Sequence, residues 1–159
     1  MRPILLLVLT FCLQSLISGL LPGWVSPPDL PFLVTLAVAS TVSPYAGLLL
    51  AFAVGLLMDL SAAGYPGLNV MGYLLGTYVF YRLLRAFHWD EPLGQFAVLA
   101  GSLLTKWLGY SLMVYWLRGE PFGLATLAPV FVSEGILTLL VAPLFLRLAR
   151  GILGNPRYE

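Results

Sequence analysis

Long apolar stretches, separated by short breaks rich in proline, glycine and charged residues, run along the whole chain. Residues 1–21 contain Arg2 as their only charged side chain, and residues 92–117 contain only Lys106. A membrane-spanning helix needs about 20 mainly apolar residues, and both of these stretches reach that length. The pattern predicts six helices, at residues 3–21, 30–43, 44–60, 67–84, 93–117 and 127–148.

The boundary between the second and third predicted helices depends on Pro44. Residues 30–60 form one long apolar stretch. As a single helix they would extend about 46 Å, whereas the hydrocarbon core of a bilayer is about 30 Å thick. Proline disfavours helix at the residue before it, here Ser43, and is accepted at the first position of a new helix. Two short or tilted spans joined by a tight turn therefore fit the stretch better than one.

Composition decides the class of protein. Hydrophobic residues make up 60% of the chain and charged residues 9%, whereas soluble domains carry roughly 25% charged residues. We therefore expect an all-α, polytopic membrane protein with a single transmembrane helical domain over residues 1–159. The first stretch starts with a positive charge, as a secretory signal does, but at about 19 residues it is longer than an h-region and no cleavage-type site follows it. We expect it to be retained as the first helix.

The arginines provide an independent check on the helix count. With six helices both termini lie on one side of the membrane, and Arg118 is the only arginine on the other side. The positive-inside rule then places both termini in the cytoplasm, whereas five helices would divide the terminal arginines between the two sides. The arginines on the predicted cytoplasmic side are Arg2, Arg82, Arg85, Arg147, Arg150 and Arg157.

Small and polar residues recur at every fourth position in three of the predicted helices, the first of them with Thr10, Gln14 and Ser18. Such rows let helices associate in lipid, and each polar group needs a partner inside the bundle. We expect ordinary helix packing, with a polar cavity or a docking surface as the functional alternative, and Gly72-x-x-x-Gly76 would also permit a homodimer. The rows are Gly47, Ala51, Gly55 and Asp59 in the third helix, and Asn69, Tyr73, Thr77 and Tyr81 beside Gly72 and Gly76 in the fourth.

Three ionisable residues fall within the predicted spans, where charges are costly and therefore point to function. Lys106 lies near the middle of the fifth helix and Glu134 in the outer half of the sixth. We hypothesise that these two side chains pair across adjacent helices, or meet through Ser102, Tyr110 or Thr138, in either a structural or a functional role. Asp59 ends the third helix, shortly before the N-terminus of the fourth, where free amides favour a carboxylate. A cap at this turn is favoured over ligand binding.

No catalytic or cofactor motif is visible in the sequence. A net charge of +1 gives no electrostatic argument for nucleic acid, and Cys12 is the only cysteine, so no intramolecular disulfide can form. The chain has no Cys/His cluster for a metal, no glycine-rich phosphate loop with lysine and no G-x-S-x-G sequence. We expect a protein that is not an enzyme and has no cofactor or metal. A membrane enzyme would have Asp59 and Glu134 as its only obvious acids or bases.

Residues 47–81 carry a more specific signal. Gly55-x-x-x-Asp59 ends one helix, a small-residue turn with Pro66-Gly67 follows, and Gly72 and Gly76 lie in the next helix. This arrangement resembles the MreD family of bacterial rod shape-determining membrane proteins. The chain length, the six helices and the cytoplasmic termini also fit that family. Asn69 departs from it, because relatives often place a histidine or a similar residue there.

The resemblance implies a non-enzymatic scaffold subunit of the cell-elongation machinery in the bacterial inner membrane, where rod shape depends on peptidoglycan synthesis. It implies the bitopic protein MreC, the MreB filament, and RodA with its penicillin-binding transpeptidase as direct or indirect partners. The family is also similar in fold to the substrate-binding subunits of energy-coupling-factor transporters. The alternative function is therefore binding of a small solute such as a vitamin.

Overall fold

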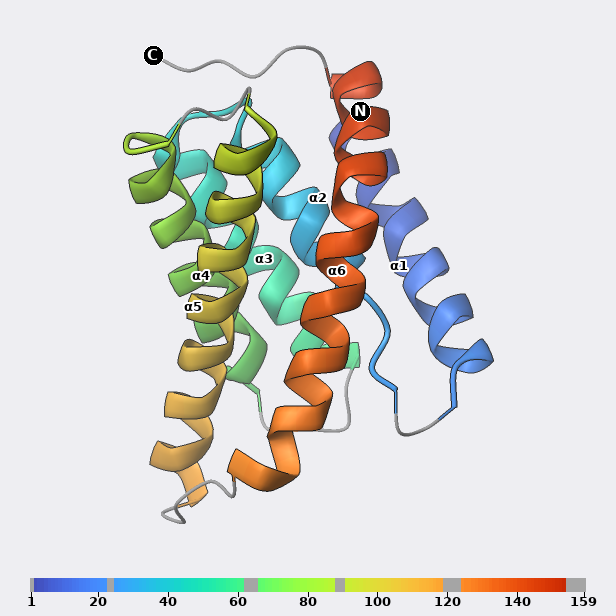
Figure 1. Ribbon diagram of the computed structural model, residues 1–159, viewed down its shortest axis with the longest axis vertical. Helices are drawn as coiled ribbons and strands as arrows, with labels where there is room; N and C mark the ends of the chain where they lie inside the picture. The colour runs from blue at the N-terminus through green and yellow to red at the C-terminus, as the bar shows by residue number, and fades with distance from the viewer. Residues whose placement is uncertain (1, 23–24, 62–65, 88–90, 119–123, 154–159) are drawn as a thin grey trace. The chain divides into compact units, whose positions relative to one another are not determined.

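The computed structural model describes residues 2–22, 25–61, 66–87, 91–118 and 124–153, which form helices joined by short non-helical connections and contain no strand (Figure 1). This confirms the all-α prediction. The helices are α1 (Arg2–Leu20), α2 (Leu30–Ala39), α3 (Pro44–Ser61), α4 (Leu68–Leu84), α5 (Pro92–Arg118) and α6 (Leu124–Leu153).

The chain breaks at Pro44 as predicted, but α2 ends earlier than residue 43. The Ser40 and Thr41 hydroxyls donate back to the carbonyls of Ala37 and Val38, and the Thr41 amide donates to the Val38 carbonyl. These tightened bonds end the helix before Ser43, where the following proline disfavours helix. With ten residues, α2 is about 15 Å long, half the thickness of the hydrocarbon core.

The last helix is longer than predicted. Residues 127–148 were expected from the length of the apolar stretch, whereas α6 runs from Leu124 to Leu153 and contains Pro129 and Pro143. Helix geometry continues past the apolar stretch because its backbone bonds do not depend on hydrophobic side chains.

Among the described residues, three helices are long and apolar enough to cross a membrane: Pro44–Ser61, Pro92–Leu117 and Ala128–Leu153. Ile4–Leu20 and Leu30–Ala39 are shorter apolar helices. The structure thus supports helices of membrane-spanning character, and six complete spans stay a prediction.

The helices group into two compact units, Met1–Ser43 with Gly123–Glu159, and Pro44–Phe122. In unit 1, α2 packs against α1 and α6. In unit 2, α4 packs against both α3 and α5. The single transmembrane domain expected from the sequence stays a prediction.

Side chains of α1 and α6 fix the segment that leads into α2 in unit 1. The Asp29 amide donates to Thr138 Oγ1 at 2.9 Å, and the Leu30 amide donates to Gln14 Oε1 at 3.3 Å. The Asp29 carboxylate then accepts from the Phe32 amide at 3.0 Å and caps α2. All ten residues of α2 are buried.

Candidate functional site: the α3–α4 turn and the faces of α4

The Asp59 carboxylate lies at the N-terminus of α4 and is 5% exposed. Its Oδ2 accepts from the amides of Gly67 at 2.8 Å and Val70 at 3.2 Å. Its Oδ1 accepts from the Asn69 amide and from Asn69 Nδ2, both at 2.9 Å. A carboxylate has about four lone-pair sites, so these four hydrogen bonds fill its acceptor capacity. Asp59 therefore caps α4 from the preceding helix.

The conformation of Gly67 makes this cap necessary. Gly67 occupies the N-cap position with φ at 102°, in the left-handed region, and α4 has no side-chain cap from that residue. Glycine adopts this conformation without strain, but it supplies no side-chain acceptor for the free amides that follow. The carboxylate supplies both the acceptors and the negative charge that a helix N-terminus favours. Pro66, which precedes Gly67, is exposed.

Gly55, one turn before Asp59, lets the backbones of α3 and α4 touch. A Cβ at Gly55 would lie 2.7 Å from Val70 Cα and 3.0 Å from the Val70 amide nitrogen. At the other end of the row, a Cβ at Gly47 would collide with the Tyr81 hydroxyl. Gly47, Ala51, Gly55 and Asp59 are all buried, so the row predicted from the sequence lies inside the protein.

A second close approach joins α4 to α5. A Cβ at Gly72 would lie 2.8 Å from the Lys106 carbonyl oxygen. From the other side, a Cβ at Gly109 would lie 3.1 Å from the Met71 carbonyl oxygen and 3.2 Å from Gly72 Cα. Gly76, one turn after Gly72, is also buried. Glycine on both helices therefore brings the two backbones into contact at one crossing.

Lys106 is buried beside aromatic rings at this crossing. Its Nζ lies 4.5 Å from the centroid of the Trp107 ring and 5.7 Å from that of the Tyr73 ring. Cation–π attraction at such distances partly offsets the cost of removing an ammonium from water. Tyr73 is the second member of the polar row of α4 and is fully buried.

Glu134 belongs to the other unit. It is buried on α6, one turn before Thr138, the residue that accepts from the Asp29 amide. Lys106 lies on α5 in unit 2, and the Lys106–Glu134 pair stays a prediction.

Two features of these sites escaped the sequence analysis. The first is the role of Asp29, which caps α2 and whose amide donates to Thr138. An aspartate just before the Leu-Pro start of a helix signals the cap, whereas no local pattern signals the bond to Thr138. The second is the contribution of α5 to its crossing with α4. Its signal is the row Gly101, Thr105 and Gly109, small residues at every fourth position.

In the described part of the chain, no group of three or more His, Cys, Asp or Glu side chains could hold a metal ion. Within unit 2, Asp59 caps α4 and Lys106 lies against aromatic rings. The arrangement stabilises turns and helix crossings.

Comparison with known proteins gives one match. Residues 1–152 match the family described as rod shape-determining protein MreD. Searches of curated proteins and of solved structures give no match. The match covers nearly the whole chain and includes the Gly55–Gly76 segment described above, whose resemblance to this family was noted from the sequence. The chain belongs to the MreD family of rod shape-determining membrane proteins.

Proposed function

We propose that this protein is a non-enzymatic scaffold subunit of the bacterial cell-elongation complex, which binds an MreC-like bitopic protein through its transmembrane and loop surfaces. The observation that carries the proposal is the family match over residues 1–152. The family's role in rod shape determination is the established part, and the scaffold role, the partner and the absence of catalysis are the proposed part.

The use of the polar groups supports a scaffold over an enzyme. Asp59, one of the two acids that could have served a membrane enzyme, uses both oxygens to cap α4. Lys106 lies against aromatic rings. A general base must be free to accept a proton from a substrate. The Asp59 carboxylate has its acceptor sites filled by the chain itself.

The exposed apolar rows support binding through helices. On α6 the exposed row consists of Val132, Ile136, Leu140, Leu144, Leu148 and Ile152, and on α5 it includes Leu104, Leu108, Leu112 and Trp116. In a bilayer such rows face acyl chains or the helices of other proteins. A bitopic partner has one spanning helix to offer, and because a row at every fourth residue winds around its helix, such a partner would pack along part of the row.

The same proposal includes topology and the wider set of partners. We infer that the chain lies in the bacterial inner membrane with both termini in the cytoplasm, since the arginine bias favours that orientation. MreB, RodA and the penicillin-binding transpeptidase are proposed as direct or indirect partners, and a homodimer through exposed helix faces is also proposed.

Depletion and replacement in a rod-shaped bacterium test the function. The host's own MreD protein is depleted while this chain is expressed with an epitope tag. We expect cells with the chain to stay rod-shaped and to yield MreC when the tag is pulled down from detergent extract. Rounded cells and no MreC, with the chain present in the membrane fraction by immunoblot, would contradict the proposal.

The rival function, binding of a small solute, predicts a bound ligand in the purified protein. A small-solute subunit of the energy-coupling-factor type retains its ligand in a closed polar pocket. Denaturing the purified chain and analysing the released small molecules by mass spectrometry tests this. A stoichiometric vitamin-sized compound, together with unchanged cell shape and a nutrient requirement on depletion, would favour the transporter subunit over the scaffold.

A further inference from the structure

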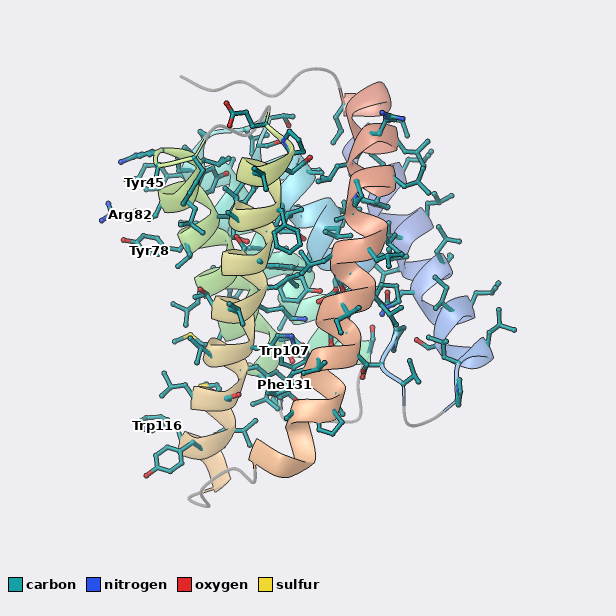
Figure 2. All side chains as sticks on the ribbon, in the orientation of Figure 1. Tyr45, Tyr78, Arg82, Trp107, Trp116 and Phe131 are labelled. Atoms are coloured by element: carbon teal, nitrogen blue, oxygen red, sulfur yellow. The ribbon has the colours of Figure 1, made fainter. Side chains whose placement is uncertain are left out.

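One side of the last turns of α4 combines a tyrosine with two arginines. Tyr78, Arg82 and Arg85 follow one another at spacings of four and three residues, which places them on one helix face. Tyr78 is 50% exposed, and both arginines are exposed. Figure 2 shows Tyr78 and Arg82 projecting outward beside each other. Within the described residues, no carboxylate pairs with Arg82 or Arg85. We call these three residues the Tyr78–Arg85 face.

The packing of unit 2 places this face near the edge of a bilayer. The contact between Gly47 and Tyr81 sets the start of α3 beside the end of α4. Tyr45, at that start, is 88% exposed, and Trp116, near the end of α5, is 80% exposed. Exposed tyrosine and tryptophan rings collect at the headgroup level of membranes. Figure 2 shows Tyr45, Tyr78 and Arg82 toward one end of unit 2 and Trp116 toward the other.

The length of α4 agrees with this placement. Its 17 residues extend about 26 Å, close to the thickness of a hydrocarbon core. A cap at Asp59 marks one end of the helix, so Arg82 and Arg85 lie at the opposite end, where long side chains reach the headgroups.

The chemistry of the face suits a phosphate. A guanidinium offers parallel N–H donors that match two phosphate oxygens, and a phenol adds one O–H donor. An anionic phospholipid carries a phosphate with no ammonium to offset it, whereas phosphatidylcholine carries both. We propose that the Tyr78–Arg85 face binds the headgroup phosphate of one anionic phospholipid. This goes beyond the scaffold function and does not depend on it.

Native mass spectrometry of the full chain in detergent tests the proposal. Phosphatidylglycerol and phosphatidylcholine are titrated separately, and the first bound lipid is quantified. We expect the first phosphatidylglycerol to bind more tightly than phosphatidylcholine. Arg82→Gln should weaken it by about tenfold or more, because it loses a charge-assisted hydrogen bond to the phosphate. Tyr78→Phe should weaken it by about fivefold, because it loses one hydrogen bond to the phosphate.

Two matched variants control for charge and for aromatic area. Arg147 is an exposed arginine whose neighbour one turn earlier is Pro143, so Arg147→Gln removes a charge without a tyrosine beside it. Tyr45→Phe removes an exposed hydroxyl with Leu49 one turn later in place of an arginine. Both controls should keep the affinity for phosphatidylglycerol within twofold of the unchanged chain.

The outcomes separate a specific site from its alternatives. Equal loss of phosphatidylglycerol affinity in Arg82→Gln and Arg147→Gln would reduce the effect to general surface charge and overturn the proposal. Equal affinity of the unchanged chain for the two lipids would overturn it as well. Unchanged lipid affinity in Arg82→Gln, together with loss of a protein that co-purifies with the unchanged chain, would assign the face to an acidic protein partner.

Discussion

Asp59 and Asn69 are joined by two hydrogen bonds to the same oxygen, Asp59 Oδ1, one from the Asn69 backbone amide and one from its side-chain nitrogen, both at 2.9 Å. The first bond caps α4 and the second fixes the orientation of the carboxylate. Oδ2 is thereby directed to the Gly67 and Val70 amides. The two residues act together in positioning the end of α3 against the start of α4.

Asp59→Asn should lower the free energy of unfolding by about 1–2 kcal/mol, and Asp59→Ala by about 2–3 kcal/mol, because buried amides lose a charged acceptor. Asparagine keeps one acceptor oxygen. Its side-chain NH2 group, however, would face backbone N–H groups of α4, and neither of these groups can accept a hydrogen bond. Thermal unfolding of the detergent-solubilised chain measures both. Glu91→Gln, which neutralises an exposed acid at the start of α5, is the control and should lower the free energy of unfolding by less than about 1 kcal/mol. A stable Asp59→Ala variant would show that the cap is unimportant.

Gly55→Ala should destabilise the chain although alanine is the better helix former. The new Cβ would lie 2.7 Å from Val70 Cα, and a backbone atom cannot turn away as a side chain can. Overpacking costs about 1–3 kcal/mol and helix propensity returns up to about 1 kcal/mol, so we expect a net loss of about 1–2 kcal/mol.

Gly135→Ala is the matched control for Gly55→Ala. A Cβ at Gly135 on α6 meets nothing within 4 Å, so only the gain in helix propensity remains. We expect Gly135→Ala to be neutral or stabilising in the same thermal unfolding assay, by up to about 1 kcal/mol. If both alanine variants shifted stability in the same direction by the same amount, packing at Gly55 would not be the cause.

Thr138→Val should destabilise unit 1 by about 1–3 kcal/mol, because the Asp29 amide loses its acceptor in a buried place. Valine keeps the shape of threonine. Thr35→Val is the control: Thr35 is equally buried, but its hydroxyl bonds only to the Pro31 carbonyl one turn earlier in its own helix. Chemical denaturation followed by tryptophan fluorescence compares the two. Equal effects of both variants would contradict a special role for the Asp29–Thr138 bond.

The sequence predicted the helical class, the break at Pro44 and the grouping of Gly55, Asp59, Gly67 and Asn69, because each follows from a local rule. Apolar length predicts helices, proline interrupts them, and a carboxylate four residues after a glycine shares its helix face. Other features depend on the tertiary fold. The length of α2 reflects hydroxyls that bond back to its last carbonyls. The connection of Asp29 to Thr138 spans more than a hundred positions of sequence, and no local periodicity encodes it.

The pairing of Lys106 with Glu134, expected from their places in the sequence, is a prediction that a double-mutant cycle can test. A lone charge left in a low-dielectric interior is costly, so Lys106→Met and Glu134→Gln should each lower the free energy of unfolding by about 3–5 kcal/mol. The double variant removes both charges. Its loss in free energy of unfolding should be smaller than the sum of the losses of the two single variants, with a coupling energy of about 1–3 kcal/mol in a double-mutant cycle. Thermal unfolding in detergent measures the four proteins. Additive effects would mean that Lys106 relies on the Trp107 and Tyr73 rings and that Glu134 has a separate role.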